Sequence, residues 1–198
     1  MENRQAKTDI YVGINGTGKT SLLKEVITQM NKQGHRILIV TPDSLEWREV
    51  PTISYRLKHH IKTYTGMRRI VYYDDCLSDV QKYFSNGVLV LDDARDYIQA
   101  QTDSVMRWLK LRRRQAGIDL FSVFHGLSQV PPEFFTFTSQ MWLFYTTDNL
   151  KRRSDCLEEH IYNEIQNAKQ DILKEVNEGN MYARRLISLD KRFEINNK

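Results

Sequence analysis

Eight residues near the N-terminus have the types and the spacing of a phosphate-binding loop. The stretch Gly13-Ile14-Asn15-Gly16-Thr17-Gly18-Lys19-Thr20 follows a short apolar run and precedes a helical pattern. Glycines here let backbone N–H groups turn toward a chain of phosphates, and the start of a helix favours a bound anion. We expect Lys19 to reach the β- and γ-phosphates and the Thr20 hydroxyl to bind Mg²⁺. The residues predicted to hold the nucleotide are Gly13, Asn15, Gly16, Thr17, Gly18, Lys19, Thr20 and Ser21.

An acidic pair supplies the second chemical group. Asp92 and Asp93 directly follow the apolar residues 88–91, a run typical of a buried strand. A carboxylate delivered beside bound phosphates can hold Mg²⁺, and a second one can orient the water that attacks the γ-phosphate. We assign the first role to Asp92 and the second to Asp93. The sequence contains no Asn-Lys-x-Asp stretch, which argues against GTP, so ATP and Mg²⁺ are the expected cofactors.

Alternating apolar runs and helical patterns must position these groups, and they predict an α/β fold. Apolar runs indicate strands at 10–14, 36–41, 88–91, 120–124 and 141–145, with 70–73 as a short extra strand. Helices are expected at 19–33, at 79–84 and within 94–115. Strands that alternate with helices form a mostly parallel sheet flanked by helices, here a five-stranded one. The phosphate loop, the acidic pair and His125 each follow such a strand, so we expect one crevice to collect them.

The composition changes after residue 150. Residues 1–150 predict a P-loop ATPase domain, and residues 151–198 predict a C-terminal helical extension. The extension repeats apolar residues at helical spacing, namely Leu157, Ile161, Ile165, Ala168, Ile172 and Val176, and a second apolar set follows within 181–195. Two interpretations stay open for it: a flap packed on the parent sheet, or a contact surface for another subunit or a portal.

Basic and aromatic residues alternate in the segment 43–69. Its basic side chains are Arg48, Arg56, Lys58, His59, His60, Lys62, Arg68 and Arg69, and its aromatic ones are Trp47, Tyr55 and Tyr64. Such a mixture suits phosphate contact and base stacking on DNA, but a solvated helix with a few packing aromatic residues fits equally well. The formal net charge of +4 and the isoelectric point near 9.0 are compatible with a nucleic-acid partner and do not require one.

Three consecutive arginines, Arg112, Arg113 and Arg114, end the helix predicted within 94–115. Positive side chains at a helix C-terminus are favoured by the helix dipole, so a solvated helix end is one interpretation. The other is an arginine finger that reaches the γ-phosphate bound by a neighbouring subunit, while the remaining arginines contact nucleic acid.

The sequence also bears on the cellular compartment. An apolar run long enough for a membrane span is absent from the 198 residues, and the N-terminal residues lack the apolar core of a signal peptide. Cys76 and Cys156 form neither a disulfide framework nor a zinc-site pattern. These observations predict a cytoplasmic protein without a membrane span.

The order of these features resembles the FtsK–HerA superfamily of ring-forming, DNA-translocating ATPases. Within it, the chain is most similar to the small viral genome-packaging ATPases, with the Zot-like filamentous-phage assembly ATPases as the near alternative. The resemblance covers roughly residues 8–149. Walker A and Walker B motifs are shared by many P-loop enzymes. The selective part is therefore the stretch 112–125, Arg-Arg-Arg-Gln-Ala-Gly-Ile-Asp-Leu-Phe-Ser-Val-Phe-His, with Pro131 soon after.

The resemblance implies a P-loop fold of the additional-strand type, a homo-oligomeric ring, DNA as a partner, and a capsid or portal as a docking partner. In this superfamily an arginine before the Gly-x-Asp stretch, here Arg113 or Arg114, acts in trans. The following strand usually ends in a Gln that senses the γ-phosphate. His125 stands in the place of that Gln, and its protonation would make activity depend on pH. Asp93 replaces the usual Glu and is one methylene shorter. Zot-like proteins usually carry a membrane span, and its absence favours packaging.

Together these features predict an Mg²⁺-dependent ATPase that translocates DNA, in particular a viral genome into a capsid, in the host cytoplasm or the virion. The predicted catalytic residues are Lys19, Asp93, His125, Arg113 and Arg114, and the predicted metal ligands are Thr20 and Asp92. Two alternatives from other classes stay open. One is a P-loop nucleoside or nucleotide kinase, in which the arginine run serves as a lid. The other is a nucleotide-dependent assembly scaffold that does not hydrolyse its nucleotide.

Overall fold

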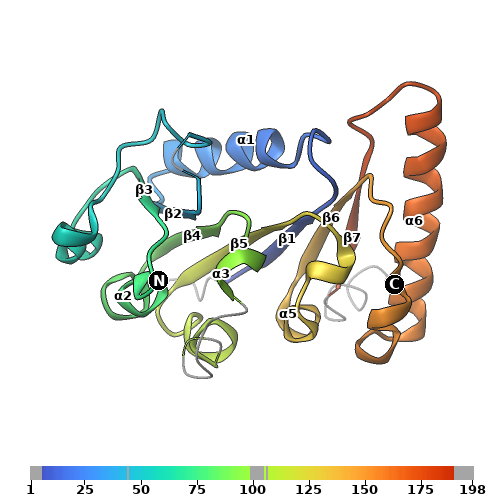
Figure 1. Ribbon diagram of the computed structural model, residues 1–198. Coiled ribbons are helices and arrows are strands. Elements are labelled where there is room, and N and C mark those ends of the chain that lie inside the picture. The colour runs from blue at the N-terminus through green and yellow to red at the C-terminus, as the bar shows by residue number, and fades with distance from the viewer. Residues whose placement is uncertain (1–5, 44, 99–104, 106, 190–198) are drawn as a thin grey trace. The chain divides into compact units, whose positions relative to one another are not determined.

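The structure is a computed structural model that describes residues 6–43, 45–98, 105 and 107–189. Over these residues it is a mixed α/β fold with seven strands in the order β3-β2-β4-β5-β1-β6-β7 (Figure 1). The described residues divide into two compact units. Unit 1 contains those within 6–7 and 24–122, and unit 2 contains those within 8–23 and 123–189.

Unit 1 is built on parallel strand pairs. β2 (Ile37–Thr41) pairs with β3 (Met67–Val71) and with β4 (Gly87–Leu91), and β4 pairs with β5 (Ile118–Phe124). Every residue of β2, β4 and β5 is buried. Strands covered on both faces are largely apolar in sequence, which is why the sequence predicted these three, although β5 starts at Ile118, before the predicted residue 120.

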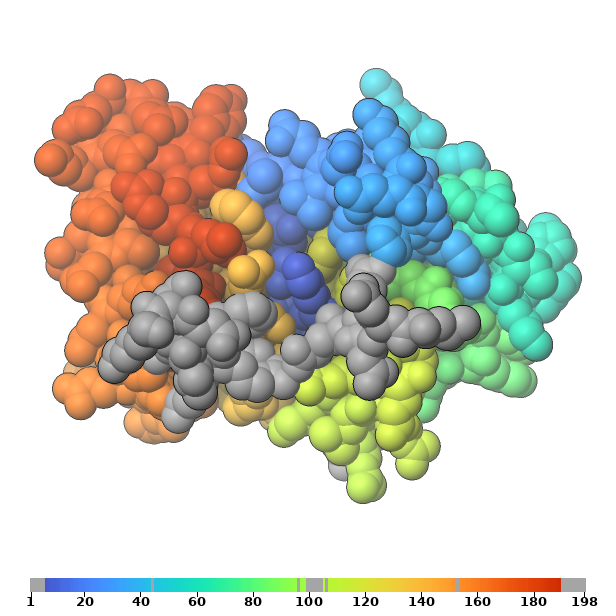
Figure 2. All heavy atoms as spheres, turned by 180° about the vertical axis from the view of Figure 1, so that it is seen from behind, coloured from blue at the N-terminus to red at the C-terminus, as the bar shows by residue number. Residues whose placement is uncertain are grey.

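The helices of unit 1 are short. They are the 3₁₀ helix η1 (Tyr55–Lys62), α2 (Cys76–Tyr83), α3 (Arg95–Ile98) and the π-helix η2 (Trp108–Arg112). η1 packs against α2, and the segment that carries it lies at the surface, in cyan and teal (Figure 2). The helix predicted within 94–115 falls partly outside the described residues, and its described parts are α3 and η2.

Unit 2 contains the remaining strands. β1 (Thr8–Val12) runs parallel to β6 (Gln140–Phe144), and β6 runs antiparallel to β7 (Arg184–Ser188). α6 (Glu159–Asn177) packs on β6 and β7 (Figure 1) and buries its apolar residues Ile161, Ile165, Ala168 and Ile172. The shorter helices are η3 (Leu127–Gln129), α5 (Pro132–Phe137) and η4 (Leu150–Cys156). α1 (Lys19–Lys32) begins with the last two residues of the phosphate loop and continues into unit 1.

The five-stranded prediction is wrong in strand number and in its C-terminal part. β3 starts at Met67, earlier than predicted, because two arginines interrupt the apolar pattern of this edge strand. β7 lies in the stretch predicted to be helical. Its residues alternate, with Leu186 exposed and Ile187 buried, as in a strand covered on one face. The helical extension therefore holds one long helix, α6, and a strand, and the domain boundary at residue 150 stays a prediction.

Among the helices of the described residues, none is both long and apolar enough to cross a membrane.

Candidate nucleotide-binding site

The phosphate loop connects β1 to α1 and is anchored within unit 2. β1 is fully buried and fixes the start of the loop. The Gly13 N–H donates to the Phe124 carbonyl at the end of β5 (3.2 Å), and the Ile14 N–H donates to the Tyr145 carbonyl just beyond β6 (2.9 Å). A Cβ on Gly13 would meet the Cβ of Phe144 at 2.6 Å, so the loop passes too close to β6 for any larger residue. Two strand ends therefore hold the loop.

Two further glycines and a buried lysine shape the loop for an anion. Gly16 and Gly18 have φ values of +80° and +90°, which favour glycine. The Thr17 hydroxyl and the Lys19 ammonium both donate to the Ile14 carbonyl, each at 2.8 Å. Lys19 is only 5% exposed. A buried ammonium beside a turn of backbone N–H groups suits the phosphates of a nucleotide.

The remaining predicted phosphate-binding residues surround this turn. Thr20 is half-buried at the start of α1, next to Lys19, and Asn15 and Ser21 are exposed. Thr20 thus lies where its hydroxyl can serve as a ligand to Mg²⁺ bound with a nucleotide. The structure brings all eight predicted residues of the loop together, and their roles toward a ligand stay predictions.

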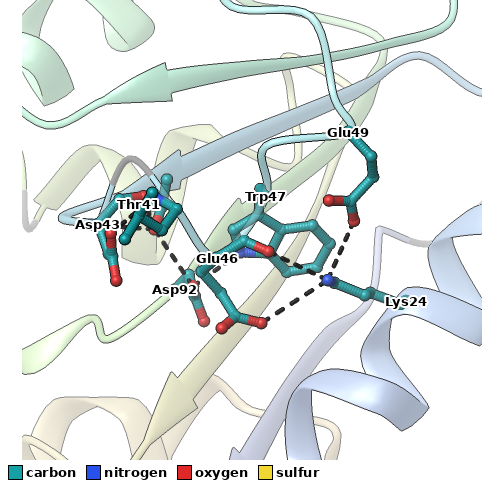
Figure 3. A network of polar contacts seen from close by, with 8 residues as sticks. Lys24, Thr41, Asp43, Glu46, Trp47, Glu49 and Asp92 are labelled. Carbon is teal, nitrogen blue, oxygen red and sulfur yellow. Dashed lines mark hydrogen bonds and ion pairs between the residues drawn. The ribbon is translucent and has the colours of Figure 1, made fainter.

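Asp92 lies in a polar network of unit 1 (Figure 3). It directly follows β4 and is 3% exposed. Its Oδ2 accepts a hydrogen bond from Trp47 Nε1 at 2.7 Å and another from the Thr41 hydroxyl at 3.3 Å. Burial raises the pKa of Asp92 to about 6, against the opposing effect of these two hydrogen bonds. A buried carboxyl group at the end of a strand can supply an oxygen ligand, so Asp92 fits the predicted Mg²⁺ ligand.

The indole that contacts Asp92 is itself held by α1. Lys24 lies over the Trp47 ring, 4.8 Å from its centroid. The same ammonium donates to the Glu46 carbonyl at 3.1 Å and pairs with the carboxylates of Glu46 and Glu49, at 3.7 and 3.0 Å (Figure 3). Trp47 belongs to the segment for which two interpretations were open, DNA contact or a solvated helix with packing aromatic residues, and at 1% exposure it is part of the core. Its contact with Asp92 was not predicted, because nothing in the local pattern pairs these two positions.

The second acidic residue has an unusual backbone conformation. Asp93 has a φ of +47°, a region that Asp adopts more readily than most residues. The Tyr97 hydroxyl donates to the Asp92 carbonyl at 2.7 Å and to the Val40 carbonyl at 3.2 Å, which fixes the preceding peptide. Such conformations are found disproportionately at functional positions. The role of Asp93 toward water stays a prediction, as does the expectation that one crevice collects the acidic pair and the phosphate loop.

His125 follows β5, next to the residue whose carbonyl anchors the phosphate loop. It is half-buried, and its backbone N–H donates to Gln129 Oε1 at 3.2 Å. Asp148 braces the same turn, because its Oδ2 accepts from the Ser128 N–H at 2.9 Å and from the Ser128 hydroxyl at 2.7 Å. A Cβ on Gly126 would meet that carboxylate oxygen at 2.1 Å. His125 therefore lies on a fixed turn at the strand end that supports the loop, and the sequence had not singled out Asp148 or Ser128.

The three arginines differ sharply in environment. Arg113 is fully buried, and its Nη1 donates to the carbonyls of Lys7 and Ile118, both at 3.2 Å. A guanidinium enclosed in this way cannot reach a neighbouring subunit, so the structure argues against Arg113 as an arginine finger. Arg112 and Arg114 are exposed. A role in trans stays a prediction, and only for these two arginines of the run.

The basic segment 43–69 is only partly available to a partner. Tyr64 is buried, and the guanidinium groups of Arg36 and Arg68 lie 4.6 and 5.9 Å from its ring centroid. Lys58 pairs with Asp79 of α2 at 3.0 Å. Other members are exposed, namely Arg48, Tyr55, Arg56, His59, His60 and Lys62. A groove with a volume of ≈ 330 Å³ lies beside η1 and includes His60 and Arg68 in its lining. DNA contact by this surface stays a prediction, now without stacking by Trp47 or Tyr64.

The fold is similar to those of solved NTPases that bind a nucleotide. The chain resembles the genome packaging NTPase B204 from Sulfolobus turreted icosahedral virus 2 in complex with AMP, with a TM-score of 0.71, 15% sequence identity, and coverage of 96% of this chain and 94% of that one. B204, the DNA-packaging ATPase from Sulfolobus turreted icosahedral virus, matches with a TM-score of 0.64, 18% identity, and coverage of 83% and 88%.

A third similar structure comes from a different system. The pCW3 conjugation coupling protein TcpA with ATPγS matches with a TM-score of 0.54 and 11% identity, over 79% of this chain and 53% of that one. No protein-family model and no curated protein sequence matches the chain. At these identities the likeness establishes the fold, and that fold agrees with the resemblance seen in the sequence.

Proposed function

We propose that this protein is an Mg²⁺-dependent ATPase that translocates DNA, and that it packages a viral genome into a capsid. The observation that carries the proposal is the phosphate loop: Lys19 is buried at the turn formed by Gly16 and Gly18, and two strand ends hold that turn. The proposal is supported by the fold, which is similar to that of B204 over nearly the whole length of both chains. Host cytoplasm or virion is the compartment that this function implies.

Each polar residue has a defined role in the proposal. The backbone N–H groups of residues 13–20 bind the phosphates of ATP, and Lys19 exchanges its bond to the Ile14 carbonyl for a phosphate oxygen. Thr20 and Asp92 would hold Mg²⁺, which neutralises charge on the phosphate oxygens. Asp93 orients the attacking water, and His125 senses the γ-phosphate.

A steady-state ATPase assay with and without DNA tests the proposal. We expect hydrolysis that DNA stimulates and that Lys19→Ala abolishes. The matched control is Lys32→Ala, because Lys32 is an exposed lysine at the opposite end of the same helix. Phosphate transfer to a nucleoside instead of water would favour the kinase alternative. Nucleotide binding without turnover in the presence of DNA would favour the scaffold alternative and refute the ATPase proposal.

The ring and its arginine finger require a separate test. We propose that Arg112 or Arg114 stabilises the transition state in the neighbouring subunit, an effect on the order of 10³–10⁵ in rate. Subunits carrying Lys19→Ala are mixed with subunits carrying Arg112→Ala and Arg114→Ala together. Partial recovery of activity supports action in trans, because some interfaces then combine an intact loop with intact arginines. Activity equal to the sum of the separate variants at every ratio would contradict it.

DNA contact is assigned to the exposed basic residues around η1. Phosphate contacts make binding fall steeply with salt, and each lost contact lowers the slope of log affinity against log salt by about 1. Arg56→Ala and Lys62→Ala should each show this change. Lys174→Ala, an exposed lysine of α6, is the control and should leave the slope unchanged. A slope unaffected by either change in η1 would remove this surface from the proposal. The proposed function also includes a capsid or portal as the docking partner of this protein.

A further inference from the structure

The turn between α6 and β7 is held by a set of polar contacts within unit 2. Glu175 of α6 pairs with Arg185 of β7 at 2.5 Å, and its other oxygen accepts from Asn180 Nδ2 at 2.9 Å. The Asn180 side-chain oxygen accepts in turn from the Tyr182 N–H at 3.2 Å. Gly179 has a φ of +100°, which lets the chain reverse here. The backbone that carries Tyr182 is therefore fixed from both sides.

This turn places the Tyr182 ring against the phosphate loop. A Cβ built on Gly18 would lie 3.1 Å from Tyr182 Cδ1 and 3.8 Å from Cε1, so the edge of the ring touches the loop one residue before Lys19. The rest of the side chain faces solvent, and the residue is 64% exposed. A flat aromatic surface thus stands open beside the backbone that would bind a nucleotide's phosphates.

The loop alone explains only part of nucleotide recognition. Its N–H groups, Lys19 and Thr20 all interact with phosphates or Mg²⁺, and inorganic triphosphate offers the same groups as ATP. A nucleobase needs a flat apolar surface on which to stack, and tyrosine supplies one at little cost in side-chain freedom.

From this placement we propose that Tyr182 is the base-contacting residue of the site, and that its ring stacks on the nucleobase of the nucleotide whose phosphates the loop holds. The inference rests on the proposed nucleotide binding but not on hydrolysis or DNA translocation. The aromatic ring is required, and the hydroxyl is not. Stacking on an aromatic side chain typically accounts for about a tenfold to hundredfold gain in affinity per base.

Calorimetric titration with two ligands tests the proposal. The first ligand is the non-hydrolysable ATP analogue AMPPCP with Mg²⁺, and the second is inorganic tripolyphosphate with Mg²⁺, which lacks a base. Tyr182→Ala should weaken AMPPCP about tenfold to hundredfold and leave tripolyphosphate within about twofold. Tyr182→Phe should bind both ligands as the wild type does. Tyr162→Ala removes a tyrosine from α6 instead and should change neither affinity.

Each other outcome contradicts the inference. Equal weakening of both ligands by Tyr182→Ala would show that the residue supports the loop and does not contact the base. Unchanged AMPPCP affinity would show that the ring only packs on Gly18. Loss of affinity in Tyr182→Phe would assign the effect to the hydroxyl. If the wild-type protein binds neither ligand, the proposed function fails and the inference fails with it, whereas nucleotide binding without turnover overturns only the ATPase proposal.

Discussion

Trp47 holds Asp92 through one short hydrogen bond, and removing the donor tests whether that bond organises the acidic end of β4. Trp47 is 1% exposed and Asp92 is 3% exposed. The substitution Trp47→Phe keeps an aromatic ring under Lys24 but deletes the indole N–H. Of the two hydrogen bonds that Asp92 Oδ2 accepts from the described residues, the 3.3 Å bond from the Thr41 hydroxyl then remains.

The size of the effect follows from this geometry. A hydrogen bond to a charged group contributes about 1.5–3 kcal/mol, and the smaller ring adds about 1 kcal/mol through the space it leaves in the core. We therefore expect Trp47→Phe to lower the free energy of unfolding by about 2–4 kcal/mol in metal-free buffer. Because Asp92 is the proposed Mg²⁺ ligand, ATP hydrolysis by this variant should also need more Mg²⁺ for half-maximal activity.

A double-mutant cycle separates the bond from general packing. Urea unfolding in EDTA, followed by circular dichroism, is measured for Trp47→Phe, Asp92→Ala and the double variant. The coupling energy should be about 1.5–3 kcal/mol. Trp142→Phe, on β6, is the control, and its coupling to Asp92→Ala should stay below about 0.5 kcal/mol. A Trp47–Asp92 coupling no larger than that of the control would refute the reasoning.

Three further predictions concern burial. Arg113→Met should lower the free energy of unfolding by about 1–3 kcal/mol, because the carbonyls of Lys7 and Ile118 lose their donor. In the same urea assay, Arg112→Ala should change the free energy of unfolding by less than about 0.5 kcal/mol. Equal losses in the two variants would contradict the burial of Arg113. Burial also raises the pKa of Cys76 to about 12, so a thiol reagent should label Cys156 in the native protein and Cys76 only after unfolding. Because the folded state keeps the Cys76 proton to higher pH than the unfolded state, stability should fall as pH rises from about 8.5 toward 12, and Cys76→Ala should reduce that fall in unfolding titrations.

The predictable part of the fold consists of elements with a strong local pattern. β2, β4 and β5 are buried on both faces, so their sequences are largely apolar, although β5 also holds Asp119 and Ser122. α6 repeats its buried residues at helical spacing. β3 and β7 are the outermost strands of the order, and their pattern is broken by arginines. For such strands, pairing with a neighbour outweighs local pattern, and pairing cannot be read from one segment alone.

The same contrast between local pattern and distant pairing applies to the candidate site. The positions of the phosphate loop and of the acidic pair follow from strand ends, which the apolar runs reveal. The sequence could not separate Arg113 from Arg112 and Arg114, because burial depends on how the π-helical turn before it directs each side chain. The pairing of Trp47 with Asp92 joins residues distant in sequence, and the local pattern of basic and aromatic residues left open whether Trp47 contacts DNA or packs.

Motif residues therefore supply only part of the candidate site in each unit. In unit 2 the loop supplies phosphate contacts, and the aromatic surface beside it comes from Tyr182 in the α6–β7 turn. In unit 1 the strand end supplies a carboxylate, and its orientation comes from Trp47. Both rings lie outside the motifs, and neither would be chosen from the motif pattern. A variant that keeps every motif residue but lacks both rings should consequently still bind tripolyphosphate, yet bind the nucleotide weakly and require more Mg²⁺. That result would show that the loop binds phosphates without the two rings, and that the rings add affinity for the nucleotide and for Mg²⁺.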